Sequence, residues 1–73
     1  MKNFLYEKRT RKNLSIRKLA NLSGVGRSTI CEIENNKRIP IVLTALRLAR
    51  ALDVNISDLF EAEEQDLYIP DTY

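Results

Sequence analysis

The chain has 73 residues, which is enough for one small domain with a compact core but too short for a deep catalytic cleft. One cysteine and no histidine exclude an intramolecular disulfide and a zinc site of thiols and imidazoles. The single cysteine favours a reducing, intracellular, cytoplasmic location, and the lack of any long apolar run argues against a membrane anchor. No cofactor, metal ion or small-molecule ligand is expected.

The first predicted helix covers residues 2–12. Phe4 and Leu5 lie there among good helix formers, and Asn13 follows as a plausible terminator. The second predicted helix begins after Ser15, whose hydroxyl can accept a hydrogen bond from a backbone N–H of the first turn.

A tight turn separates the second helix from the third. Gly24 stands where a helix must end in a left-handed residue, and Val25 fills the corner. Gly26 occupies the N-cap position of the third helix, where it is a weaker cap than Ser or Thr. Residues 15–36 therefore predict a helix-turn-helix. The apolar side chains expected on its inner side are Leu19, Ala20, Leu22, Ile30 and Ile33.

The third helix, about residues 27–35, has two sides of different chemistry. Side chains that form hydrogen bonds recur at helical intervals on the side opposite Ile30 and Ile33. These outer residues are Arg27, Ser28, Cys31, Glu32 and Asn35. Such a helix is suited to lie in a groove.

A polar, basic loop follows, and Pro40 disfavours helical geometry at the residue before it. Residues 41–52 predict a fourth, amphipathic helix, and residues 56–60 predict a last short one. The expected core consists of Leu5, Leu14, Leu19, Ala20, Val25, Ile30, Ile33, Val42, Ala45, Leu46, Ala49, Leu52, Val54, Leu59 and Phe60.

The charges are distributed unevenly along the chain. Residues 1–60 hold all twelve Lys and Arg residues and five acids, whereas residues 61–73 hold five acids and no cation. We therefore divide the chain into a basic domain, residues 1–60, and an acidic C-terminal tail, residues 61–73. The basic domain points to a polyanionic partner, and the alternative is that both segments are ordinary solvated surface.

These patterns together resemble the Cro and phage-repressor type of helix-turn-helix, also called the Xre family, over residues 4–60. The residues that carry the resemblance are Leu5, Arg9, Leu14, Ser15, Leu19, Ala20, Gly24, Val25, Ser28, Thr29, Ile30, Ile33, Glu34, Pro40, Leu46, Ala49, Leu52, Val54, Leu59 and Phe60. The resemblance implies an all-α, five-helix, lambda-repressor-like DNA-binding fold. The chain departs from the family at Ile16, where Gln is usual, and at Gly26, where Ser or Thr is common.

In the family, the start of the third helix reaches base edges. Arg27 can present two donors to guanine O6 and N7, Ser28 can contact either kind of base, and Glu32 can accept a hydrogen bond from cytosine N4. The alternative for Arg27 is a solvated or phosphate-bound charge. For Glu32 it is a surface acid paired with Arg27 or Lys37.

Other family positions contact the DNA backbone or stabilise the fold. The expected phosphate contacts are Arg17, Asn35, Asn36, Lys37 and Arg38, with an ordinary helix-ending loop as the alternative for the last four. Arg9 and Glu34 are expected to form a structural ion pair.

The sequence thus predicts a transcriptional regulator that binds double-stranded DNA, as a homodimer and as a repressor. The rival interpretation is a helix-turn-helix protein-interaction module, or antirepressor, that does not bind DNA. An enzyme is not expected, because the chain lacks histidine, a phosphate-binding loop and a paired-carboxylate cleft.

Overall fold

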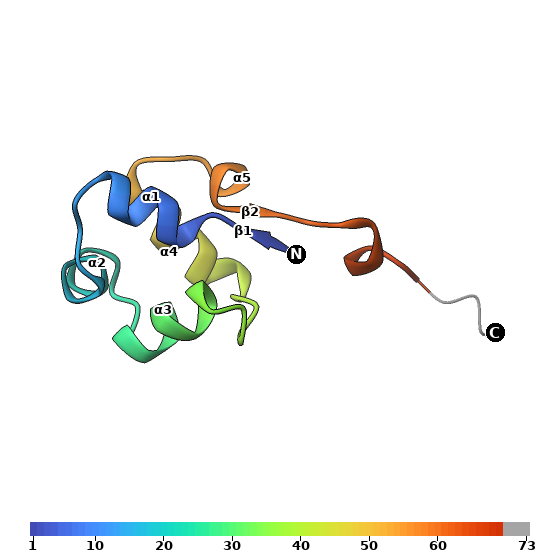
Figure 1. The fold of residues 1–73 in the computed structure, drawn as a ribbon, viewed down its shortest axis with the longest axis horizontal. Coiled ribbons are helices and arrows are strands. Elements are labelled where there is room, and N and C mark those ends of the chain that lie inside the picture. Colours follow the sequence, from blue (N-terminus) through green and yellow to red (C-terminus); the bar gives the residue numbers. More distant parts are fainter. Residues whose placement is uncertain (70–73) are drawn as a thin grey trace.

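The computed structural model describes residues 1–69, and it is mostly helical (Figure 1). Its helices are α1 (Leu5–Arg11), α2 (Ile16–Ser23), α3 (Arg27–Glu34), α4 (Val42–Leu52) and α5 (Ile56–Leu59). The expected all-α, five-helix architecture is confirmed. None of the helices in the described part has both the length and the apolar character that crossing a membrane requires.

Two short strands join the ends of the helical body. β1 (Lys2–Asn3) pairs antiparallel with β2 (Phe60–Glu61), so that Lys2 faces Glu61 and Asn3 faces Phe60. The first helix therefore begins at Leu5 rather than at residue 2, and the last one ends at Leu59. The sequence did not predict this pairing, because two residues are too few to leave an alternating pattern.

A left-handed residue other than glycine follows α1, α3 and α4 within two positions of the last helical residue. Asn13, Asn36 and Asp53 have φ angles of 58°, 59° and 55°. After α3, the Asn36 N–H donates to the Ile33 carbonyl at 3.0 Å and the Lys37 N–H donates to the Glu32 carbonyl at 2.8 Å. These bonds satisfy carbonyls that the end of the helix would otherwise leave unpaired.

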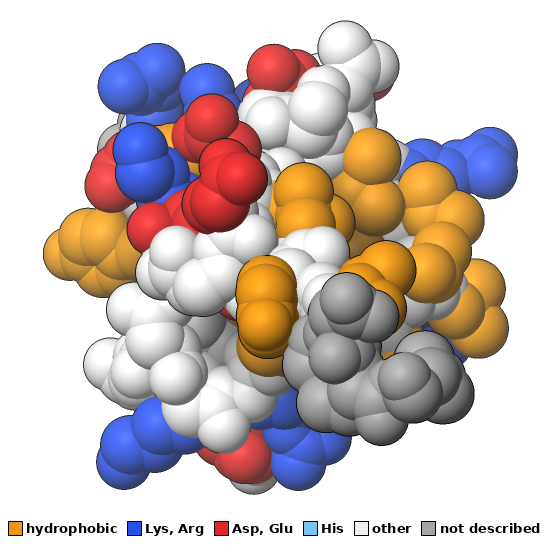
Figure 2. Space-filling model, turned by 90° about the vertical axis from the view of Figure 1, so that its right-hand side faces the viewer, with side chains coloured by type: hydrophobic (Ala, Val, Ile, Leu, Met, Phe, Trp, Pro, Cys, Tyr) orange, Lys and Arg blue, Asp and Glu red, His pale blue; other side chains and the backbone are white. Residues whose placement is uncertain are grey.

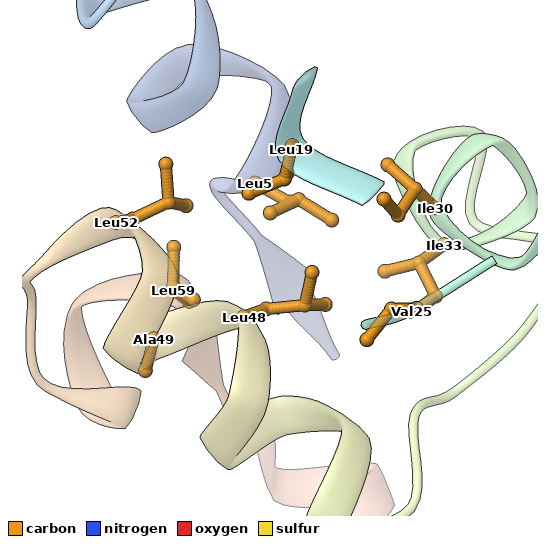
Figure 3. Close-up of a cluster of buried hydrophobic side chains, with 9 residues drawn as sticks. All are labelled: Leu5, Leu19, Val25, Ile30, Ile33, Leu48, Ala49, Leu52 and Leu59. Carbon is orange, nitrogen blue, oxygen red and sulfur yellow. The ribbon is translucent and has the colours of Figure 1, made fainter. Parts of the chain in front are cut away.

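The core forms where α2 lies against α3 and α4, α4 against α5, and α1 against α3 (Figure 3). Its principal side chains are Leu5, Leu19, Val25, Ile30, Ile33, Leu48, Ala49, Leu52 and Leu59. Leu14, Ala20, Val54 and Phe60 are partly buried against this cluster.

The prediction for the buried side of α4 was partly wrong. Val42 and Leu46 were expected in the core, but they are 72% and 49% exposed, and Leu48 is fully buried instead. Residues 45, 48, 49 and 52 also follow a helical repeat, so the inward stripe is rotated from the expected one. Leu22 of α2 is likewise 53% exposed.

Beyond β2 the chain leaves the helical body and extends away from it (Figure 1). This segment contains one 3-10 turn, η1 (Glu64–Asp66), and gives the molecule a longest dimension of 47 Å against 20 and 19 Å in the other directions.

Candidate nucleic-acid interface

Local hydrogen bonds fix the two helices of the helix-turn-helix. The Ser15 hydroxyl accepts from the Lys18 N–H at 3.0 Å and so caps α2. At the other end Gly24 has φ 75°, and its N–H donates to the Ala20 carbonyl at 2.9 Å. Because φ is positive at this position, glycine avoids the steric cost that a side chain would carry in the turn.

The N-cap of α3 is Gly26, with φ −63° and ψ 147°. This extended conformation is open to any residue, and a Cβ added there would have only the Thr29 hydroxyl within 4 Å, at 3.8 Å. The N-cap position of α3 could therefore hold a residue with a side chain, and with Gly26 there the helix has no side-chain cap.

The outer side of α3 is open to solvent. Ile30 and Ile33 are fully buried, whereas Arg27, Ser28 and Cys31 are exposed. An open hollow of about 500 Å³ is lined by Ile16, Arg27, Ser28, Cys31 and Glu32. The structure thus brings the three predicted base contacts together on one open surface. Ile16, where the chain departs from the family pattern, lies beside them.

Arginine side chains also line two other hollows beside the α2–α3 turn. Arg17 and Arg27 both line a second open hollow, of about 510 Å³, at the corner between α2 and α3. On the other side of the turn, Arg38 and Arg47 line a third hollow of about 390 Å³. Clustered cations of this kind favour a polyanion.

Four polar residues at these hollows were not among the predicted contacts, and one of them, Thr29, lies in α3 beside Gly26. Asn21 lies with Arg17 and Arg27, while Thr44 and Arg47 lie with Arg38. No local signal marks Arg47, because its position beside the α2–α3 turn depends on how α4 packs against α2.

Glu32 has a different partner from the two that the sequence suggested. Its carboxylate lies 3.4 Å from Arg38 Nη2, and both side chains are substantially exposed. The left-handed residue Asn36 turns the chain back along α3 and so brings Arg38 near Glu32. An exposed pair of this kind contributes at most about 1 kcal/mol to stability, so a ligand can readily compete for either partner.

The Asn35 side chain forms hydrogen bonds within its own helix end. Its side-chain amide donates to the Cys31 carbonyl at 2.9 Å and lies 3.5 Å from Cys31 Sγ. Asn36, Lys37 and Arg38 are exposed in the loop that follows. Cys31 itself is a free, exposed thiol, and no group of three His, Cys, Asp or Glu side chains within residues 1–69 could hold a metal ion.

A buried ion pair connects α1 to the end of α3. Arg9 Nε donates to Glu34 Oε2 at 2.7 Å, and Arg9 Nη2 donates to Glu34 Oε1 at 3.0 Å. Arg9 Nη1 also donates to the Leu14 carbonyl at 2.8 Å, and the guanidinium lies over the Tyr6 ring at 5.3 Å from its centroid. The bonds to Glu34 raise the pKa of the Arg9 guanidinium above its ordinary value.

The N-terminal segment holds the same end of α3. The Asn3 side-chain amide donates to the Ile33 carbonyl, and its oxygen accepts from the Leu5 N–H at 2.9 Å. Both ends of α3 are therefore held in place. The α2–α3 turn holds its first residues, and contacts with α1 and β1 hold its last turn.

Comparison with known proteins gives matches over most of the chain. The helix-turn-helix family model HTH_3 matches residues 5–59. YgzD of Bacillus subtilis, an uncharacterized HTH-type transcriptional regulator, is 36% identical over 90% of this chain and all of its own length. MJ0272 of Methanocaldococcus jannaschii, of the same description, is 38% identical over the same shares. The crystal structure of the restriction-modification controller protein C.AhdI from Aeromonas hydrophila superposes with a TM-score of 0.73 and 43% identity, covering 77% of this chain and 85% of that one.

Proposed function

The chain belongs to the helix-turn-helix family HTH_3, of the Xre type, and is a DNA-binding transcriptional regulator; we propose that it reads the major groove of double-stranded DNA with α3. The observation that supports this most directly is the recessed outer surface of α3. There Arg27, Ser28 and Glu32 line one hollow, and further arginines line the two hollows beside the α2–α3 turn.

In this proposal, some polar residues contact base edges and others contact phosphates. Arg27 and Ser28 contact base edges, and Glu32 accepts from cytosine N4 after leaving Arg38. Arg17, Asn35, Asn36, Lys37 and Arg38 contact phosphates. For Asn35 this requires the side-chain amide to exchange a hydrogen bond to Cys31 for one to a phosphate oxygen. We add Arg47 to the phosphate contacts, because it lines the hollow that Arg38 lines.

We propose that the active species is a homodimer. One short recognition helix covers few base pairs, and two helices about 34 Å apart would read an operator with two-fold symmetry. We expect repression, since a small dimer that occupies a promoter excludes polymerase from it, and we place this activity in the cytoplasm.

Replacing Arg27 and Lys37 separately by Ala tests the assignment. Arg27→Ala should cost about 1 to 3 kcal/mol on an operator selected from random duplex and flatten the preference at one base pair per half-site. Lys37→Ala should weaken binding to every duplex alike and reduce the salt slope by about one unit per contact. Lys2→Ala, on β1, is the matched control for the loss of one positive charge and should leave the preference unchanged.

Glu32→Ala adds an independent check. It removes a negative charge from the groove-facing surface, so binding to random duplex should strengthen while discrimination at one base pair falls. If Arg27→Ala weakens operator and random duplex equally, the base-reading role of Arg27 is wrong.

The second candidate function is a protein-interaction module. Ile16 and Glu32 support it, because an apolar and an acidic side chain line the same hollow on the surface that would meet DNA. A gel shift with random duplex at low salt separates the two candidates. The regulator should bind with a steep salt dependence, whereas the module should not bind at all.

A further inference from the structure

Two exposed apolar clusters lie on different parts of the chain. The α4 apolar patch consists of Ile39, Ile41, Val42, Leu43 and Leu46, whose exposed fractions range from 49% to 72%. The tail cluster consists of Leu67, Tyr68 and Ile69, which are 69%, 72% and 81% exposed. Contiguous exposed apolar surface of this kind marks an interaction site in a small protein. Figure 2 shows hydrophobic side chains gathered on one side of the view that looks along the tail toward the body.

Ion pairs join the root of the tail to the N-terminus. The Met1 ammonium lies 3.0 Å from Glu63 Oε1 and 2.8 Å from Asp66 Oδ2. Within the tail, the Glu63 N–H donates to Asp66 Oδ2 at 2.8 Å, which closes the η1 turn. Since β2 is also paired with β1, the tail cluster is presented outward from the end of the molecule (Figure 1).

The charges of the two clusters are complementary. Glu61, Glu63, Glu64 and Asp66 precede the tail cluster, so it lies in an acidic segment. Arg50 lies one turn after Leu46 on the outward side of α4, and within residues 1–69 it forms no ion pair. Ile39 and Ile41 also line the hollow that Arg38 and Arg47 line, so the patch has cations beside it there too. An acidic, apolar segment therefore matches both the apolar side chains of the α4 apolar patch and the cations next to it.

From these observations we propose that the tail cluster of one copy docks on the α4 apolar patch of a second copy, with the two tails exchanged. A two-fold arrangement makes both contacts at once, because each copy carries one tail and one patch. The inference deepens the proposed function, since it names the surfaces that hold the DNA-reading dimer together. It also leaves the outer side of α3 free in both copies.

Subunit mixing of full-length variants tests the exchange. The tail variant is Leu67→Glu with Tyr68→Glu, and the patch variant is Leu43→Glu with Leu46→Glu. Each should raise the dimer dissociation constant at least about tenfold in sedimentation velocity, because each places acids in both contacts. The matched control is Leu22→Glu, which adds an acid at an exposed leucine of α2. This variant should change the dimer dissociation constant less than about twofold.

The decisive measurement is native mass spectrometry of an equimolar mixture of the two variants. A mixed dimer retains one intact tail against one intact patch, so heterodimers should form at concentrations where neither variant alone is dimeric. Circular dichroism checks that the tail variant and the patch variant both remain helical. If the patch variant loses its helical signal, Val42→Glu takes its place.

Three results would overturn the exchange. They are a monomeric parent protein, dimers that tolerate the tail variant, and a mixture that yields no heterodimer because each tail folds onto its own body. No DNA is present in these measurements, so their outcome is separate from that of the gel shift.

Discussion

The buried pair of Arg9 and Glu34 provides the sharpest test of how the fold is stabilised. In Arg9→Met, the aliphatic part of the side chain is kept and the guanidinium is lost. The Glu34 carboxylate, 7% exposed, then loses both of its hydrogen bonds. Removing one partner of a buried pair leaves an uncompensated charge, so the free energy of unfolding should fall by about 3 kcal/mol.

The reverse change should cost less. In Glu34→Gln, the Arg9 guanidinium keeps its bond to the Leu14 carbonyl and its position over the Tyr6 ring, and the new amide oxygen can still accept one bond. We therefore expect a loss of about 1 to 2 kcal/mol, smaller than that of Arg9→Met. The double variant Arg9→Met with Glu34→Gln removes both charges, so its loss in the free energy of unfolding should fall below the sum of the two single losses by about 2 kcal/mol.

Urea unfolding followed by circular dichroism at low temperature measures all four corners of this cycle. For a domain of this size, a loss of 3 kcal/mol also corresponds to a fall in Tm of roughly 12–24 °C. Single losses below about 1 kcal/mol that simply add in the double variant would show that the pair behaves like a solvated surface pair, and the reasoning from burial would then be refuted.

Three further predictions concern the cap of α3, the buried side of α4 and the contact of the tail with Met1. Gly26→Ser should raise the free energy of unfolding by a few tenths of a kcal/mol, because the N-cap conformation suits Ser and the space for its Cβ is free; an unchanged or lower urea midpoint would contradict this. Leu48→Ala should cost about 2 to 5 kcal/mol, and Leu46→Ala less than about 0.5 kcal/mol at monomeric concentrations, in the same assay. The hydrogen bond with Asp66 raises the pKa of the Met1 ammonium above 8.0, and the same bond lowers the pKa of Asp66 below 3.8. The contact should therefore be complete between these values and be lost as the pH rises through the raised pKa or falls through the lowered one, which amide chemical shifts of the tail would report.

The helix-turn-helix could be predicted from the sequence because local chemistry determines it. Ser15 caps α2 through a hydrogen bond three residues away, and Gly24 ends α2 through its own positive φ. Ile30 and Ile33 then fix which side of α3 is buried. None of these features depends on a distant part of the chain, so a short sequence window contains the information.

Features that depend on distant segments were not predictable in the same way. The pairing of β1 with β2 joins the two ends of the body, and neither strand has a pattern of its own. Arg47 lies near Arg38 only because α4 packs against α2. The partner of Glu32 depends on the path of the loop after α3, which a choice between Arg27 and Lys37 by sequence spacing could not anticipate.

The rotation of α4 has the same origin, and it bears on the proposed exchange. Apolar residues occupy most of this helix, so two stripes satisfy the helical period. Ala45, Ala49 and Leu52 belong to both stripes, and the buried one adds Leu48 where the expected one has Val42 and Leu46. Leu43 and Leu46 then lie on the exposed side of α4, where they do not contribute to the core. The choice of the inward stripe therefore creates the α4 apolar patch, and a second copy of the chain carries, in its tail, an acidic apolar segment suited to cover it.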